Sequence, residues 1–90
     1  MVDFFFKIML YSRSGIIHKT TMITKTLGNC VQKRRKELGM KQSELALVSG
    51  TGVRFISDLE NGKETCELGK TLKVLDHIGL ELTLNPKAGG

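Results

Sequence analysis

Apolar residues recur at a helical spacing from residue 27 onward. Leu27, Val31 and Leu38 lie four and seven positions apart, which places them on one face of an α-helix. Gly39 follows the last of them, and glycine commonly ends a helix in a left-handed conformation. The pattern predicts a first helix that begins near residue 27, behind a threonine N-cap, and ends at Gly39.

A short apolar stripe predicts a second helix over residues 42–48. Its inner face is expected to hold Leu45, Ala46 and Val48. Gly50 is expected to end this helix by taking a left-handed backbone conformation.

A third helix is expected after a tight turn. Thr51 is a good N-cap residue, and Val53, Ile56 and Leu59 share one face because they are three positions apart. Gly62 stops the helix. The opposite face is polar and carries Arg54, Ser57, Asp58 and Asn61.

A fourth helix is predicted behind Thr65 as N-cap, with Gly79 closing its C-terminus. Its buried stripe is expected to consist of Leu68, Leu72, Leu75 and Ile78. Gly69 lies inside this helix and costs about 1 kcal/mol relative to alanine, which is too little to prevent folding.

The hydrophobic period changes from helical to alternating after the fourth helix. Leu80, Leu82 and Leu84 alternate with polar residues, which is the pattern of a short β-strand with one apolar face. A proline two positions later breaks the pattern. Residues 80–86 are therefore predicted to form a C-terminal strand, and residues 87–90 a frayed tail.

The first 26 residues show no helical period and are rich in Phe, Ile, Met and Thr. Two interpretations stay open. Either residues 4–10 form a short strand followed by a turn at residues 12–15, or Met22 is the natural start and the earlier residues are an upstream extension. We therefore treat residues 1–26 as an N-terminal extension and residues 27–79 as the helical domain.

Charge narrows the class of partner only after the charges are located. The chain has a net charge of +5, but residues 1–26 hold four Lys or Arg against one Asp, which leaves +2 for residues 27–90. Four consecutive cations at residues 33–36 make a local basic spot. An anionic partner such as nucleic acid is therefore indicated by the position of the charges rather than by their total.

Several kinds of site are not indicated by the sequence. Cys30 and Cys66 lack CxxC spacing and a histidine cluster, so we expect neither a zinc site nor a disulfide, and interpret both as reduced packing residues. No paired carboxylates or nucleophile–base couple is visible, so we expect no enzyme activity, cofactor or metal. No run of about 18 apolar residues is present, which predicts a cytoplasmic protein with no membrane partner.

The segment KQSELALVSGTGVRFISDLENGK, residues 41–63, resembles the signature of the Xre/Cro, or lambda-repressor-like, helix-turn-helix family. The matching features are Gln-x-x-Leu-Ala, a turn glycine, Ile-Ser and Leu-Glu-Asn-Gly-Lys in register. The resemblance covers residues 27–78 and implies a mainly α fold of four to five helices. It also implies that residues 52–61 form a recognition helix that reads a specific DNA operator.

The resemblance assigns DNA-contacting roles to particular positions. The residues expected at base edges are Thr51, Val53, Arg54, Ser57 and Asp58. The residues expected at backbone phosphates are Gln42, Lys41, Arg34 and Lys63. Arg54 is the strongest candidate, because a guanidinium can form a bidentate pair with guanine. Arg35 and Glu60 align with an internal salt bridge of the family, which implies a structural role.

Three residues have alternative interpretations that the sequence leaves open. Arg34 faces either phosphate or solvent. Asp58 is an acid on the DNA-facing side, so it either accepts from a cytosine amino group or tethers Arg54, four residues earlier on the same face. Phe55 either touches a thymine methyl group or packs against the second helix or a neighbouring residue.

The block TLKVLDHIGLELTLNP, residues 71–86, resembles the HipB-like antitoxins, whose C-terminal strands pair across a two-fold axis. A lone strand would leave its hydrogen bonds unpaired and expose Leu80, Leu82 and Leu84. We therefore expect this strand to pair with a second copy, or else with the N-terminal segment.

These resemblances imply a homodimeric repressor that binds a palindromic operator in double-stranded DNA. As an antitoxin it would regulate its own operon and bind a HipA-like kinase toxin. Two alternatives stay open. One is a phage or chromosomal repressor of the same family without a toxin partner. The other is a protein-interaction or membrane-surface module that no longer reads DNA.

Overall fold

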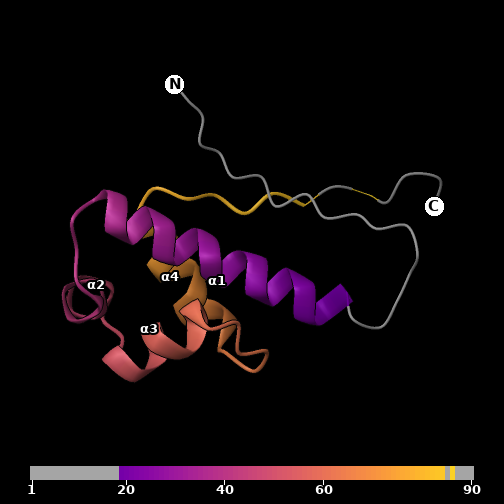
Figure 1. Ribbon diagram of the computed structural model, residues 1–90, viewed down its shortest axis with the longest axis horizontal. Helices are drawn as coiled ribbons and strands as arrows, with labels where there is room; N and C mark the ends of the chain where they lie inside the picture. The colour runs from indigo at the N-terminus through magenta and orange to yellow at the C-terminus, as the bar shows by residue number, and fades with distance from the viewer. Residues whose placement is uncertain (1–18, 85, 87–90) are drawn as a thin grey trace.

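Four helices make up the part of the chain that the computed structural model describes, residues 19–84 and 86. They are α1 (Lys19–Glu37), α2 (Gln42–Ser49), α3 (Val53–Glu60) and α4 (Leu68–His77), as Figure 1 shows. The mainly α fold predicted from the hydrophobic pattern is therefore confirmed. The strand and turn predicted within residues 4–15, and the tail at 87–90, lie outside the described residues.

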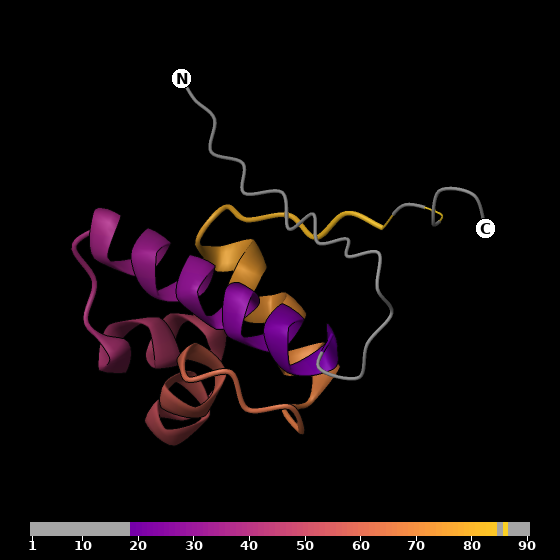
Figure 2. The same ribbon diagram turned by 45° about the vertical axis from the view of Figure 1, so that its right-hand side comes forward.

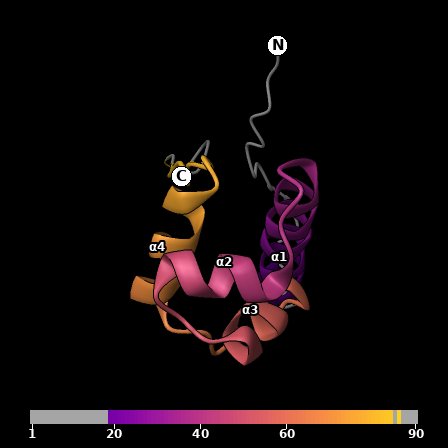
Figure 3. The ribbon, with the colours of Figure 1, turned by 90° about the vertical axis from the view of Figure 1, so that its left-hand side faces the viewer.

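The helices are arranged so that α3 lies on the outside of the bundle. α3 packs against α1 and α2, and α2 also packs against α4. Seen end-on in Figure 3, α1 and α4 stand on either side, α2 lies across the space between them, and α3 lies below α2. One face of α3 is therefore held by the bundle while the other is available to a partner.

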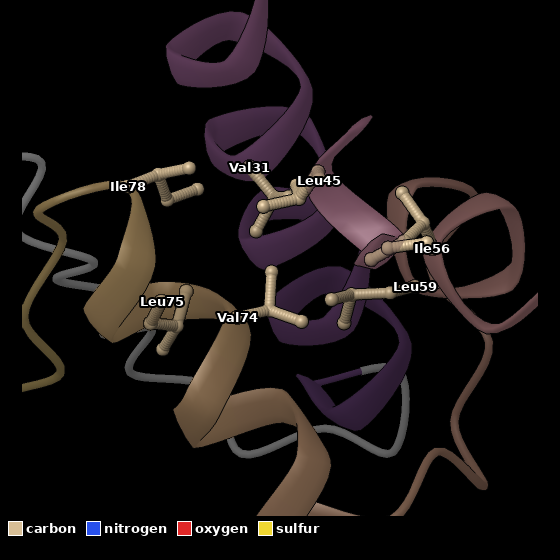
Figure 4. Packing of buried hydrophobic residues seen from close by; sticks show 8 residues of the cluster. Val31, Leu45, Ile56, Leu59, Val74, Leu75 and Ile78 are labelled. Atoms are coloured by element: carbon tan, nitrogen blue, oxygen red, sulfur yellow. The ribbon is translucent and has the colours of Figure 1, made fainter. Parts of the chain in front are cut away.

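A single apolar core holds this arrangement, and every helix contributes to it. Its buried members are Val31, Leu45, Ala46, Ile56, Leu59, Val74, Leu75 and Ile78, most of which are labelled in Figure 4. Burying an aliphatic side chain of this size stabilises the fold by about 1.5–3 kcal/mol. The two α3 members, Ile56 and Leu59, fix the rotation of that helix, as their spacing predicts. Val53, which was expected on the same apolar face, is 47% exposed.

Helix α1 begins at least eight residues earlier than the periodicity indicates. It runs without interruption from Lys19 and crosses the boundary between residues 26 and 27 at which the helical pattern starts. The early part is rich in threonine, a β-branched residue of low helix propensity, and Thr24 and Thr26 lie inside the helix rather than capping it. Leu38 lies past the end of α1 and is exposed, so the stripe predicted for this helix is one residue too long.

Two glycines allow α1 and the end of α3 to cross at close range. A methyl group added at Gly28 would collide with the carbonyl oxygen of Leu59 and lie 2.6 Å from that of Glu60. Gly62, which follows α3, is buried with φ of 82°, and a methyl group there would lie 3.0 Å from the Cα atom of Lys25. Gly62 was predicted as a helix stop, whereas the sequence gives no sign of the role of Gly28.

The remaining helices end where glycine predicts. Gly39, Gly50 and Gly79 follow α1, α2 and α4 with φ of 70°, 70° and 72°. Predicted helix starts were less accurate. Gly52, not Thr51, is the N-cap of α3, and Glu67, not Thr65, is the N-cap of α4.

The buried face of α4 matches the predicted stripe at Leu75 and Ile78 but not at its other two positions. Leu68 and Leu72 are exposed, and the buried residues are Thr71, Val74, Leu75 and Ile78. The spacing of the leucines is compatible with burial of either helix face. Thr71 lies on the buried face although it is polar, so the apolar pattern does not reveal that face. Its Oγ1 atom donates to the carbonyl oxygen of Glu67 at 2.9 Å, which satisfies the hydroxyl inside the helix.

The segment after α4 is extended but forms no strand within the described residues. Leu80 donates its backbone N–H to the carbonyl oxygen of Leu75 at 2.9 Å and packs against the core. Leu82 and Leu84 are exposed. Residues 80–84 leave the end of α4 as an extended chain, which Figure 2 shows in yellow.

Candidate nucleic-acid interface

The turn between α2 and α3 is fixed by local hydrogen bonds. Ser49, at the end of α2, is buried and donates through Oγ to the carbonyl oxygen of Leu45 at 2.7 Å, while the same Oγ lies 3.1 Å from Oγ1 of Thr51. The backbone N–H of Thr51 donates to the carbonyl oxygen of Ala46 at 2.9 Å. Val48, predicted to face inward, is exposed, and Ser49 takes its place. The angle between α2 and α3 is therefore held by the turn as well as by the core.

The residues predicted to contact bases lie on the outer side of α3 or in the turn before it. Val53 and Arg54 are exposed in the first turn of the helix, and Ser57 and Asp58 are half-buried one turn later. Thr51 is half-buried in the turn, where its hydroxyl is close to Ser49. The structure thus brings four of the five onto one helix face and keeps Thr51 beside it.

A buried ion pair locks α3 to α1. Arg35 donates to Glu60 through Nε at 2.6 Å and through Nη2 at 3.0 Å, and through Nη1 to the carbonyl oxygen of Met40 at 2.8 Å. The hydrogen bond to Glu60 raises the pKa of the Arg35 guanidinium, although burial opposes the shift. Gln42 donates to the same carboxylate at 3.0 Å. This cluster joins α1, the start of α2 and α3 at one point.

Asp58 pairs with two of the predicted DNA-contacting cations. Its Oδ1 atom lies 3.8 Å from Nε of Arg54, and its Oδ2 atom lies 3.4 Å from Nζ of Lys63. The alternative in which Asp58 tethers Arg54 therefore has a geometric basis. Lys63, which is predicted to contact phosphate, shares the same acid.

Arg34 has a structural role that the predicted phosphate contact does not include. Its Nε atom donates to the carbonyl oxygen of Ile78 at 2.8 Å, just past the end of α4, and its Nη1 atom lies 3.4 Å from Glu37. A cation at this position pairs with the unsatisfied carbonyl groups of the α4 C-terminus. The predicted phosphate contact of Arg34 stays a prediction, and the bond to Ile78 gives this residue a structural role as well.

The start of α2 places Lys41 and Gln42 beside each other. The N–H of Lys41 donates to the Glu44 side chain at 2.8 Å, so an acid in the first turn supplies the capping that Lys41 itself lacks. The Lys41 side chain is exposed, and Gln42 is half-buried because it bonds to Glu60. Gln42 thus braces α3 from α2.

Comparison with known protein families identifies the segment that contains these helices. A family model described as helix-turn-helix matches residues 31–82, more than half of the chain. The chain belongs to this helix-turn-helix family. It is 47% identical over 58 residues to a protein of Sinorhizobium fredii (strain NBRC 101917 / NGR234) named uncharacterized HTH-type transcriptional regulator y4mF. That match covers 64% of this chain and 76% of the relative.

The helix-turn-helix match contains α2, α3 and α4 in full and the last part of α1, residues 31–37. In helix-turn-helix proteins the second helix of the motif is the one that enters the major groove of DNA. By position in the matched segment that helix is α3. The family is one of DNA-binding regulators rather than of enzymes, in agreement with the class expected from the sequence.

One helix-turn-helix residue outside the predicted set also lies against α3. Nζ of Lys70, on α4, stands 5.7 Å from the ring centre of Phe55, and Phe55 itself packs against the core. Phe55 therefore packs against the core, and its contact with a thymine methyl group stays a prediction. No pattern in the sequence indicates Lys70, because the contact joins residues fifteen positions apart on two different helices.

The two cysteines of this helix-turn-helix domain are packed thiols. Cys30 is buried and Cys66 is half-buried. Burial raises the pKa of both thiols, and for Cys66 the negative charge of Asp58 adds to the increase.

Within residues 19–84 and 86, no cluster of three or more His, Cys, Asp or Glu side chains is placed to hold a metal ion. No helix in this part of the chain is long and apolar enough to span a bilayer.

Proposed function

We propose that this protein is a sequence-specific DNA-binding transcriptional repressor that inserts α3 into the major groove. The observation that carries the proposal is the contrast between the two faces of α3. The inner face holds Ile56, Leu59 and the buried Glu60, whereas the Arg54 side chain on the outer face is 88% exposed. A rigidly held helix with an exposed guanidinium is suited to reading guanine, because hydrogen bonds to base edges need a fixed geometry.

Phosphate contacts are assigned to residues at both ends of the helix-turn-helix unit. Lys41 is exposed at the start of α2, and Lys63 follows the end of α3. Contacts of this kind position a protein on the duplex without reading sequence. The Gln42 side chain bonds to Glu60, so we assign it mainly to bracing α3. The Gln42 backbone lies at the start of α2, the end that we assign to phosphate.

The first test of this proposal is selection of duplexes from a random pool by the purified protein, followed by sequencing. We expect a common motif, and a palindromic arrangement of that motif would indicate two copies on one operator. Recovery of fragments with no shared motif would contradict sequence-specific binding.

A pair of variants separates base reading from phosphate contact. Arg54→Ala is expected to reduce discrimination against one base of the selected motif by about 1–3 kcal/mol. Lys63→Ala is expected to weaken binding to all duplexes and to lower the slope of log K against log salt by about one. Fluorescence anisotropy on operator and scrambled duplexes measures both. Equal losses on operator and scrambled DNA for Arg54→Ala would remove Arg54 from the base-reading set.

We further propose that the protein is a homodimer joined through its C-terminal segment. Leu82 and Leu84 are 38% and 87% exposed, and they lie in a segment in which apolar and polar residues alternate. No backbone hydrogen bond joins residues 81–84 to another described residue. Pairing with the same segment of a second copy would satisfy those backbone groups and cover both leucines.

Substitution of the two exposed leucines tests this interface. Leu82→Ser together with Leu84→Ser is expected to convert the dimer to a monomer in analytical ultracentrifugation and to weaken operator binding more at low protein concentration. Leu47→Ser is the matched control, because Leu47 is 80% exposed on α2, outside the segment. A wild-type protein that sediments as a monomer at all concentrations would exclude this dimer.

The finer proposal is that the repressor is the antitoxin of a HipA-type operon. Its support is the C-terminal block of residues 71–86, which resembles the HipB-like antitoxins. Co-expression with a HipA-like kinase encoded beside this gene is expected to yield a complex that survives gel filtration. A repressor that binds its operator but has no such neighbour belongs instead to the chromosomal or phage repressors without a toxin.

A further inference from the structure

The acid on the outer side of α3 is placed between two cations that DNA would also attract. Oδ1 of Asp58 faces Nε of Arg54 at 3.8 Å, and Oδ2 faces Nζ of Lys63 at 3.4 Å. The Asp58 side chain is 29% exposed, whereas those of Arg54 and Lys63 are 88% and 52% exposed. The carboxylate is therefore sheltered between the cations, while both cations remain open to a ligand.

The end of α3 holds Lys63 in this position. The backbone N–H of Lys63 donates to the carbonyl oxygen of Asp58 at 3.0 Å, and that of Gly62 donates to the carbonyl oxygen of Leu59 at 3.1 Å. This pair of bonds is the Schellman arrangement that closes many helices. Lys63 is thus bound to Asp58 through its backbone and its side chain, and the ion pair needs no ordering of a long loop.

The pairing changes what the outer face of α3 offers to DNA. Arg54 and Lys63 alone would present two positive charges, but with Asp58 between them the cluster carries a net charge of only +1. Binding to non-operator DNA depends almost wholly on such charges, whereas operator binding adds hydrogen bonds to bases. Neutralising one cation therefore removes a larger share of non-operator binding than of operator binding.

We propose, resting on the proposed function, that Asp58 is a specificity-determining residue that acts through Lys63 and Arg54. In the free protein the Asp58 carboxylate pairs with both cations and repels DNA phosphate, which weakens binding to non-operator DNA. At the operator, the terminal Nη1 and Nη2 groups of Arg54 meet a base edge, because the contact with Asp58 uses Nε. The acid thus raises the ratio of operator to non-operator affinity without touching DNA.

A direct role for Asp58 in reading cytosine is the competing explanation. A carboxylate on a recognition helix can accept from the cytosine amino group. Both of its oxygens already face cations in this structure, and a move toward a base would leave Lys63 without its acid. The two explanations predict opposite effects of removing the charge, since a cytosine contact strengthens operator binding and an intramolecular pair weakens non-operator binding.

The experiment is a double-mutant cycle on DNA binding with the full-length protein. The variants are Asp58→Asn, Lys63→Gln and the two combined, with Asp76→Asn as control. Asp76 is an exposed acid on α4, so the control makes the same charge change away from α3. Affinity is measured by fluorescence anisotropy for the selected operator and for a scrambled duplex at several salt concentrations, and melting by circular dichroism checks that each variant is folded.

Asp58→Asn is expected to tighten binding to the scrambled duplex by about two- to fivefold, the range that an exposed ion pair can supply. The salt slope on the scrambled duplex should become steeper, because the carboxylate no longer competes with DNA phosphate for Lys63. Operator affinity should change less, so the specificity ratio falls. Asp76→Asn should leave the ratio unchanged, and in the Lys63→Gln background most of the effect of Asp58→Asn should disappear.

Two outcomes would overturn the inference while leaving the proposed function intact. One is a loss of operator affinity at a single base position with no gain on scrambled DNA, which indicates cytosine reading. The other is a gain that persists unchanged in the Lys63→Gln background or appears equally in Asp76→Asn, which indicates a general charge effect. A wild-type protein with no sequence preference would contradict the proposed function and this inference together, and is recognised before any variant is compared.

Discussion

Replacing Glu60 with alanine should cost about 3–5 kcal/mol of folding free energy. The Glu60 side chain is 1% exposed and accepts three hydrogen bonds, two from Arg35 and one from Gln42. Its removal leaves the buried Arg35 guanidinium with the Met40 carbonyl as its remaining partner. Domains of this size have roughly 5–15 kcal/mol of stability, so the loss is a large part of the total. Urea denaturation followed by circular dichroism measures it.

Two further variants separate the ion pair from a general loss of charge. Glu37→Ala removes an acid that pairs with Arg34 at 3.4 Å on the surface, and it should cost less than about 1 kcal/mol. The combination Arg35→Met with Glu60→Leu should recover most of the loss, because apolar residues of similar volume often replace a buried pair at little cost. A Glu60→Ala variant as stable as Glu37→Ala would show that the pair contributes nothing.

Gly28→Ala should destabilise the protein by about 2–3 kcal/mol, the upper part of the range for overpacking. Intrinsic helix propensity alone predicts the reverse, since alanine in a helix interior is favoured over glycine by about 1 kcal/mol. Here the added methyl group meets backbone carbonyl oxygens of Leu59 and Glu60, which cannot rotate away as a side chain can. α1 and the end of α3 must therefore separate, and the melting temperature should fall by about 8–24 °C.

Gly69→Ala is the matched control for this substitution. Gly69 is the second residue of α4, and an added methyl group meets nothing within 4 Å. This variant should be unchanged or more stable by up to about 1 kcal/mol. If both glycine variants were stabilised, the close crossing of α1 and α3 would be refuted.

The helix ends and the orientation of α3 are the parts of the fold that sequence predicted well. Glycine at the C-terminus of a helix has a local cause, the left-handed backbone, so Gly39, Gly50 and Gly79 could be recognised without tertiary information. The α3 face was predicted correctly at Ile56 and Leu59, which are buried, but not at Val53, which is exposed. Local chemistry and packing agree at these positions.

Half of the buried face of α4 and the start of α1 were predicted wrongly for related reasons. On α4, apolar residues lie on two faces, and the choice between Leu72 and Val74 as a core residue depends on which helix packs against it. On α1, packing and continuity of the helix override the low propensity of its threonines. Both errors come from tertiary contacts that a one-dimensional pattern does not contain.

The candidate site was accessible from sequence only where a known signature covers it. The signature supplied the outer face of α3 and the pairing of Arg35 with Glu60, whose atoms are 2.6 Å apart although the residues are 25 positions apart in the chain. It did not supply the bond from Arg34 to Ile78 or the position of Lys70, which arise from the way α1, α3 and α4 meet in this chain. Long-range polar contacts of this kind leave no spacing in the sequence.

Under the proposed function, the length of α3 limits how many base pairs one copy of the protein can read. Eight residues at about 1.5 Å each give a helix of about 12 Å, which faces about four base pairs at about 3.4 Å per pair. A sequence of four base pairs recurs by chance about once in 256 positions of random DNA. A genome that offers about a million competing positions or more therefore holds thousands of copies. Under the proposed function, recognition of a single genomic site therefore requires several copies of α3 on one operator.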